Sequence, residues 1–90
     1  MDKEFLEQVV FSTNYVLREK SPIIDVFHDI DGTWQFFGPE KNITTDNGVI
    51  LLMKEILEID PTLIQAIDIP KGHVARRVSI GSKWIIEKHD

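Results

Sequence analysis

The sequence predicts an α+β domain in which an antiparallel sheet of four to five strands packs one face against two short consecutive helices. Several short runs rich in β-branched and aromatic residues are separated by turn-forming residues, which is typical of strands. These runs occupy residues 9–11, 23–28, 33–37, 74–80 and 83–88. Residues 49–67 instead repeat their apolar positions at helical spacing. A chain of 90 residues can bury a modest core, so we expect residues 1–90 to form one domain.

The N-terminal part predicts one strand followed by one brief helix. Residues 9–11 form the strand and residues 14–19 form the helix. Ser12 or Thr13 can cap this helix, because a hydroxyl oxygen accepts a hydrogen bond from a free N–H group of the first turn. Pro22 then interrupts the helical pattern, since proline cannot continue a helix.

Residues 23–37 predict a β-hairpin with a tight turn. The dipeptide Asp31-Gly32 suits a two-residue turn, because glycine adopts the positive φ that such a turn requires. This turn length places Phe27 opposite Phe36 in the register of the two strands.

Side chains alternate between the two faces of the second strand of this hairpin. Trp34 and Phe36 therefore share one face, while Gln35 and Phe37 share the other. Because both faces carry an aromatic ring, the core cannot include all of these rings. Residues 39–48 follow as the longest irregular segment, and we expect this segment to be mobile or to make contacts.

Two helices are expected next. Residues 49–59 form the best helical pattern of the chain, with Asp46 or Asn47 as the N-cap. A second helix begins at Asp60-Pro61, because aspartate caps a helix and proline in the first turn needs no N–H group. The side chains expected to point inward are those of Val49, Leu52, Met53, Ile56, Leu63, Ile64 and Ile67.

The C-terminal segment predicts another hairpin, with its turn near Gly81. A two-residue turn places Arg76 opposite Glu87, whereas a three-residue loop places Val78 opposite Trp84. The second register buries more apolar surface, but both registers fit the pattern.

Arg76 and Arg77 form the one cationic cluster of the sequence, with Lys71 and His73 nearby. Neighbouring residues of a strand point to opposite faces, so the two guanidinium groups cannot easily form a common anion site. We expect one exposed arginine and one arginine that pairs with Glu87 or with the acidic middle of the chain.

The composition excludes several classes of protein. The chain has no cysteine, so disulfides, thiolate nucleophiles and cysteine-based zinc sites are excluded. Its first residues carry alternating charges and lack the apolar stretch of a secretory signal. No apolar run approaches the ~18 residues of a membrane-spanning helix. We therefore expect a cytoplasmic protein that does not bind a membrane.

The sequence offers no convincing catalytic or metal site. Residues 29–32 resemble part of a calcium loop, but their glycine is fourth in the pattern rather than sixth. His28 and His73 lie at no spacing typical of metal ligands. The serines lack the nucleophile-elbow pattern, and no glycine-rich phosphate loop occurs. We expect no catalytic residue, no metal and no cofactor, and we do not expect an enzyme.

Charge is distributed unevenly along the chain. Residues 21–70 carry nine carboxylates against two lysines, whereas residues 71–90 have a net charge of +3. An acidic middle disfavours nucleic acid, whose phosphates need a basic surface, and it matches a basic protein. The alternative is that the acidity only keeps the domain soluble. If it serves binding, the expected contact residues are Asp29, Asp31, Phe37, Glu40 and Asp46.

Four sequence blocks occur in a recognisable order. They are Gly32-x-Trp34-x-Phe36-x-Gly38-x-Glu40, then Leu52-x-x-Glu55-Ile56-Leu57-x-x-Asp60-Pro61-x-Leu63, then Ile69-Pro70-x-Gly72, and finally Arg76 with a late Trp84. This order resembles a family of small bacterial domains of unknown function, some of which are assigned as immunity proteins of polymorphic toxin systems. The resemblance covers residues 9–88 and implies no catalytic residue. Many members carry a longer acidic insert between the first two strands, which the turn at Asp31-Gly32 replaces here.

The leading hypothesis for function is a non-catalytic protein-binding domain. The resemblance implies an immunity-type inhibitor that neutralises a toxin by stoichiometric contact. The alternative is a housekeeping or regulatory interaction module unrelated to toxins, and an unrecognised enzyme is third. A toxin gene beside this gene favours the inhibitor, whereas a conserved polar cluster in a pocket favours the enzyme. The sequence does not predict the oligomeric state.

Overall fold

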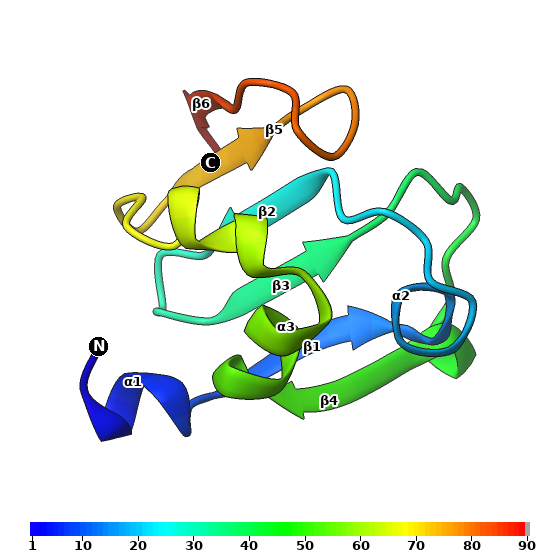
Figure 1. Ribbon diagram of the computed structural model, residues 1–90, viewed down its shortest axis with the longest axis horizontal. Coiled ribbons are helices and arrows are strands. Elements are labelled where there is room, and N and C mark those ends of the chain that lie inside the picture. Colours follow the sequence, from blue (N-terminus) through cyan, green and yellow to red (C-terminus); the bar gives the residue numbers. More distant parts are fainter. Residues whose placement is uncertain (90) are drawn as a thin grey trace.

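The computed structural model describes residues 1–89, which form a sheet with helices over one face (Figure 1). The elements are α1 (Lys3–Leu6), β1 (Val9–Thr13), α2 (Asn14–Arg18), β2 (Asp25–His28), β3 (Trp34–Phe37), the 3-10 helix η1 (Thr45–Asn47), β4 (Gly48–Leu52), α3 (Met53–Ile59), the 3-10 helix η2 (Pro61–Gln65), β5 (His73–Arg76) and β6 (Ile85–Lys88). Over these residues, no helix has both the length and the apolar character needed to span a bilayer.

The six strands form one mixed sheet in the order β4-β1-β3-β2-β5-β6. Strands β1 and β3 run parallel, and every other neighbouring pair runs antiparallel. The α+β class is confirmed. The predicted sheet, wholly antiparallel with four to five strands, differs from the observed one in strand number and in the parallel β1–β3 pair. That pair joins segments that are distant in the sequence, so no local pattern indicates it.

Strand β4 lies where the sequence predicted the start of a helix. Its five residues pair antiparallel with the five residues of β1. Leu51 is buried in the core and Val49 packs against the core, whereas Ile50 is 67% exposed on the other face. Apolar residues at consecutive positions fit a strand and a helix equally well, and the pairing with β1 decides between them.

Helix α3 therefore begins later than predicted, at Met53. Its first turn is capped by the Glu55 carboxylate, which accepts a hydrogen bond from the Leu52 N–H at 2.8 Å. The predicted caps Asp46 and Asn47 belong to η1 instead, where Asn47 Oδ1 accepts from the N–H of Thr44 at 3.1 Å.

The predicted caps of the other two helices are confirmed. Thr13 Oγ1 accepts from the N–H of Val16 at the start of α2, and Asp60 Oδ1 accepts from the N–H of Thr62 at the start of η2. Leu63 is fully buried as expected, but Ile64 is 52% exposed. The 3-10 helix has three residues per turn, so Leu63 and Ile64 point in different directions.

The β2–β3 hairpin has a longer turn than predicted. Residues 30–32 form a three-residue loop, closed by a hydrogen bond of 2.9 Å from the N–H of Gly32 to the carbonyl three residues earlier. Gly32 has a φ of 93°, which glycine adopts without strain. The extra loop residue shifts the register by one. Phe36 therefore lies opposite Val26 rather than opposite Phe27.

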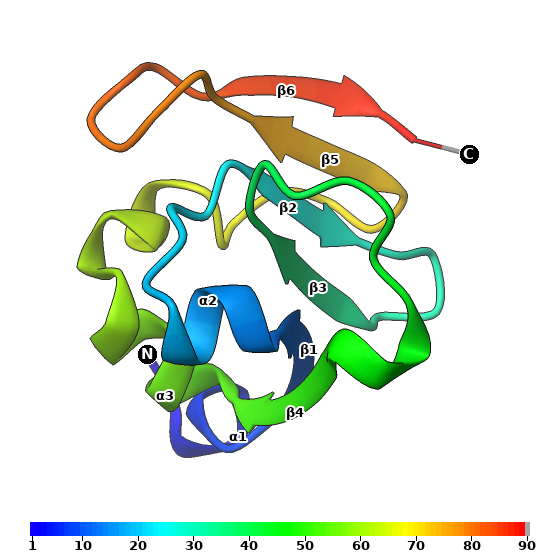
Figure 2. The same cartoon turned by 90° about the vertical axis from the view of Figure 1, so that its right-hand side faces the viewer.

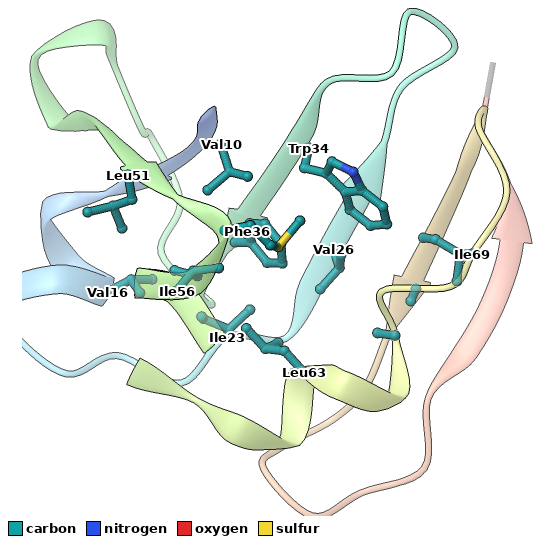
Figure 3. Close-up of a cluster of buried hydrophobic side chains, with 13 residues drawn as sticks. Val10, Val16, Ile23, Val26, Trp34, Phe36, Leu51, Ile56, Leu63 and Ile69 are labelled. Carbon is teal, nitrogen blue, oxygen red and sulfur yellow. The ribbon is translucent and has the colours of Figure 1, made fainter. Parts of the chain in front are cut away.

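The core lies between the sheet and the helices (Figure 3). Trp34 and Phe36 are buried within it, whereas Gln35 and Phe37 are half-buried on the opposite face, so the predicted division of faces is confirmed. The ring of Phe5 from α1 meets the ring of Trp34 edge to face, with 6.3 Å between centroids. The core residues are Val10, Val16, Ile23, Val26, Trp34, Phe36, Leu51, Met53, Ile56, Leu63, Ala66, Ile69 and Ala75.

Arg77 is the cation that pairs with the acidic middle of the chain. It is 5% exposed, and its guanidinium donates to Asp60 Oδ2 at 2.7 Å and to Thr62 Oγ1 at 2.8 Å. Its Nε also donates to the carbonyl of Ile23 at 3.0 Å, and the guanidinium carbon lies 4.2 Å from the ring centroid of Trp84. The expectation that one arginine is paired is thereby confirmed.

The β5–β6 register matches neither predicted alternative. Arg76 lies opposite Ile85, and residues 77–84 form the connection between the strands. At the two ends of this connection, the Arg77 guanidinium lies over the Trp84 ring, while the Arg77 N–H donates to the carbonyl of Ile24 at 3.0 Å and continues the β2–β5 ladder.

Replacing Trp34 by alanine should destabilise the domain by about 3 to 5 kcal/mol, because truncating a large core aromatic leaves a cavity. The free energy of unfolding in urea measures this loss. Ile64→Ala is the matched control, and this exposed position should change stability by less than about 0.5 kcal/mol. Equal effects of the two substitutions would contradict the burial of Trp34.

The neighbouring arginines should differ sharply when each is replaced by methionine. Arg77→Met leaves the Asp60 carboxylate buried without its cation and should cost about 3 to 5 kcal/mol of unfolding free energy. Arg76→Met removes a half-exposed ion pair and should cost less than about 1 kcal/mol. Urea unfolding of both variants gives the comparison, and similar losses would show that the Arg77 pair does not hold the fold.

Candidate protein-binding groove

Within residues 1–89, one face of the sheet carries no α-helix, and the β3–β4 connection with the 3-10 helix η1 borders it (Figure 2). Side chains that alternate with the core residues point to this face, which we call the open face. Phe11 of β1 pairs with Gln35 of β3 on one side and with Ile50 of β4 on the other. Phe11 is 41% exposed, so an aromatic ring and an isoleucine lie side by side at the surface.

A groove of about 660 Å³ lies over this part of the open face. The connection between β3 and β4, drawn in green in Figure 2, supplies one wall with residues 43–45. Strands β1, β3 and β4 supply the floor, and the β2–β3 hairpin supplies the far end. The lining residues are Phe11, Ser12, Asp29, Asp31, Thr33, Gln35, Phe37, Ile43, Thr44, Thr45, Gly48, Val49 and Ile50.

Two carboxylates from the hairpin give the groove an acidic end. Asp29 Oδ2 accepts a hydrogen bond from Gln35 Nε2, which fixes its orientation. Asp31 Oδ1 accepts from the N–H of Thr33 at 2.9 Å. Hydrogen bonds from the backbone and the side chain of Thr33, together with the nearby charge of Lys71, hold the pKa of Asp31 below its ordinary value. Asp31 is therefore ionised at neutral pH.

Three of the five predicted contact residues come together in this groove. Asp29, Asp31 and Phe37 all line it. Asp46 is exposed on η1 and does not line it. Glu40 also lies outside the groove, although it precedes the wall by only a few residues.

Glu40 contacts other parts of the protein and does not have the exposed position that we expected. Its Oε2 accepts a hydrogen bond from Ser21 Oγ, and its Oε1 is buried without a hydrogen-bond partner. The carboxylate thereby attaches the start of the β3–β4 connection to the segment between α2 and β2. Its charge is turned toward the protein, whereas Asp31 is exposed.

Sequence reasoning missed two apolar residues of the groove, Phe11 and Ile50. Phe11 follows two valines in β1, and the alternation alone does not show which face of that strand is covered. Ile50 was assigned to a helix. Reading residues 48–52 as a strand would have placed Ile50 opposite the core side chains, so the signal was present but ambiguous.

The histidines of the sheet take part in packing. The His28 ring stacks on Trp34 with 3.9 Å between centroids, and its Nδ1 lies 2.9 Å from the carbonyl oxygen of Ile69. His73 lies opposite His28 in the β2–β5 pair. Within residues 1–89, no three side chains of the metal-binding types gather at one point.

Asp25 lies at the rim of the open face, 3.5 Å from Nε of Arg76. Burial raises the pKa of Asp25, and the Arg76 charge only partly opposes this shift. A raised folded-state pKa means that folding stability falls as the pH rises from below the ordinary aspartate value through the folded value. Asp25→Asn removes this loss.

We therefore expect Asp25→Asn to be more stable than the wild type at pH 7 and equal to it at about pH 3, where both side chains are neutral. Urea midpoints at the two pH values measure the difference. A variant less stable than the wild type at pH 7 would show that the ion pair with Arg76 outweighs the cost of burial.

Comparison with known proteins gives no further information about this groove. No family model, no curated protein and no solved structure matches the chain. The resemblance to the immunity-protein family therefore stays a prediction.

Proposed function

We propose that this chain is a non-catalytic protein-binding domain whose open-face groove receives a basic partner protein. The observation that carries the proposal is the convergence of Asp29, Asp31 and Phe37 with Phe11 and Ile50 around one groove. The groove combines an apolar floor with a charged end, which is typical of a protein–protein interface. In such interfaces aromatic side chains hold the complex, and charged residues at the rim increase the rate of association.

The exposure of the groove floor favours a protein over a small molecule. Small-molecule sites bury most of the ligand surface inside a concave pocket. Here the floor residues are themselves accessible, since Ile50 is 67% exposed and Phe11 is 41% exposed. A partner that covers the open face can bury both side chains, whereas a small ligand leaves them in water.

Charge supports a basic partner. Asp31 stays ionised at neutral pH, and the segment from residue 21 to residue 70 has a large excess of carboxylates. A basic surface gains long-range attraction to such a segment and associates faster. The attraction weakens as salt is added, because the Debye length falls to about 8 Å at physiological ionic strength.

Our narrower proposal is that the partner is a bacterial toxin that the domain neutralises by stoichiometric binding. The resemblance of the four sequence blocks to immunity-type domains supports it. A toxin gene adjacent to this gene provides the direct test. Wild-type protein should then protect cells that express the toxin, and Ile50→Asp should not, while remaining folded. Protection by both proteins would exclude the groove as the inhibitory surface.

Neutralising one groove carboxylate should slow association with the basic partner recovered from the native host. Asp31→Asn keeps an oxygen for the Thr33 N–H, so the loop keeps its shape, and the association rate should fall severalfold at low salt. Surface plasmon resonance at two salt concentrations measures the rate.

Asp46→Asn provides the matched control, because it removes the same charge outside the groove. It should change the association rate less than Asp31→Asn does. Equal slowing by the two substitutions would indicate a general effect of net charge. Failure to recover any basic partner would reject the proposed function.

A further inference from the structure

We infer that the edge strand β6 pairs antiparallel with β6 of a second copy of this chain, about a two-fold axis that passes through the sheet at Ile86. The two six-stranded sheets then form one continuous sheet across the dimer. The groove lies over β1, β3 and β4, near the opposite edge of the sheet. Both copies therefore keep their grooves open, and the inference does not depend on the proposed function.

Strand β6 is an uncovered edge of the sheet. It is the last strand in the sheet order, and within residues 1–89 no other element lies beyond it (Figure 2). All four of its residues are exposed, with Ile85 at 62% and Ile86 at 50%. Proteins often protect such an edge with a proline, a bulge or a covering element. Strand β6 has no proline, and it pairs with β5 at four successive positions without a bulge.

The hydrogen-bond pattern shows which backbone groups of β6 face outward. The N–H of His89 donates at 2.7 Å to the carbonyl that directly precedes β5. Bonding to one neighbour alternates along an antiparallel strand, so Glu87 and Ile85 also exchange hydrogen bonds with β5. The N–H and carbonyl groups of Ile86 and Lys88 therefore point away from the sheet. These groups are available to another strand.

The other edge strand, β4, is largely blocked. The N–H of Met53 bonds to the segment that precedes β1, so by the same alternation Gly48, Ile50 and Leu52 face the free edge. The N–H of Gly48 donates to a carbonyl of η1, and the N–H of Leu52 donates to the Glu55 carboxylate. Two of the three outward N–H groups of β4 are thus already used, whereas those of β6 are free to pair.

The sequence of β6 is complementary to itself in one register. When Ile86 lies opposite its own copy, the two residues exchange both hydrogen bonds across the axis. Glu87 then lies opposite Ile85 of the second copy and diagonal to Lys83 of the second copy, which carries the opposite charge. A register centred on Glu87 instead places two carboxylates opposite each other, which is destabilising. Charge therefore selects the register centred on Ile86.

Pairing also covers apolar surface on both faces of the sheet. Ile86 lies opposite Ala75 of the core, so its side chain is on the face that carries the helices, and Ile85 is on the open face. Each isoleucine gains a neighbour from the second copy. A two-fold interface uses the same patch on both copies, so every such contact occurs twice.

A pair of cysteine variants tests the register directly, because the chain has no cysteine of its own. Opposed residues that exchange hydrogen bonds have Cα atoms about 5.5 Å apart, within reach of a disulfide. Ile86→Cys should therefore give a covalent dimer on mild oxidation, measured by electrophoresis without reductant. Ile85→Cys is the matched control, because diagonal neighbours lie about 7–8 Å apart, which is too far for a disulfide.

Sedimentation equilibrium measures the association without a cross-link. The wild type should rise with concentration from the 10.4 kDa of one chain toward twice that mass. Ile86→Lys places like charges opposite each other and should raise the dimer dissociation constant by about tenfold or more. Ile64→Lys adds the same charge at a position of equal exposure on η2 and should change the constant by less than about twofold. Urea unfolding checks that both variants are folded.

Three results would overturn the inference. The first is a wild type that stays monomeric at every concentration, and the second is equal cross-linking of Ile86→Cys and Ile85→Cys. The third is a dimer that cross-links through Ile50→Cys but not through Ile86→Cys, which would identify β4 as the paired edge. Binding of a basic protein to the groove is measured separately, so a monomer that still binds this protein leaves the proposed function in place.

Discussion

The buried pair of Arg77 and Asp60 connects the helical layer to the sheet. Burying two charges is costly unless their remaining hydrogen-bonding groups are also satisfied. Here the guanidinium donates to Asp60, to Thr62 and to the carbonyl of Ile23, while Asp60 also accepts from the N–H and the hydroxyl of Thr62. The pair thereby ties the end of β5, the start of η2 and the approach to β2 to one point.

The helices that this pair attaches to the sheet determine which face of the sheet stays exposed. With α3 and η2 fixed over one face, the core side chains of every central strand must point toward them. The alternate side chains, among them Phe11, Phe37 and Ile50, then lie on the open face. The groove is thus a consequence of a one-sided layer of helices.

Local signals in the sequence predicted the elements that local chemistry controls. Hydroxyl and carboxylate caps located the starts of α2, at Ser12 or Thr13, and of η2, at Asp60. The alternation in β3 separated Trp34 and Phe36 from Gln35 and Phe37, and the structure shows that the first pair is in the core. The Asp31-Gly32 pair located the hairpin, but a two-residue turn and a three-residue loop both use a glycine with positive φ. Loop length was therefore ambiguous by one residue, and that residue set the register.

Long-range pairing could not be predicted in the same way. Strand β4 became a strand because β1 was available beside it, and the sequence around Ile50 fits a helix equally well. The prediction of the candidate site was limited in the same way. Asp29, Asp31 and Phe37 were found because they belong to one hairpin, whereas Phe11 and Ile50 were missed because they reach the groove through pairings between distant segments.

The groove wall depends on residues that do not line the groove. The β3–β4 connection is held near its start by the bond between Ser21 and Glu40 and near its end by Thr44 and Asn47. Gly38 makes the first attachment possible. A Cβ atom there would lie 2.7 Å from Glu40 Oε1 and 2.9 Å from the carbonyl oxygen of Pro22, which is too close for either contact. Gly38 and the half-buried Glu40 therefore hold the groove wall from outside the groove, which explains why this acidic residue contacts the protein instead of lining the groove.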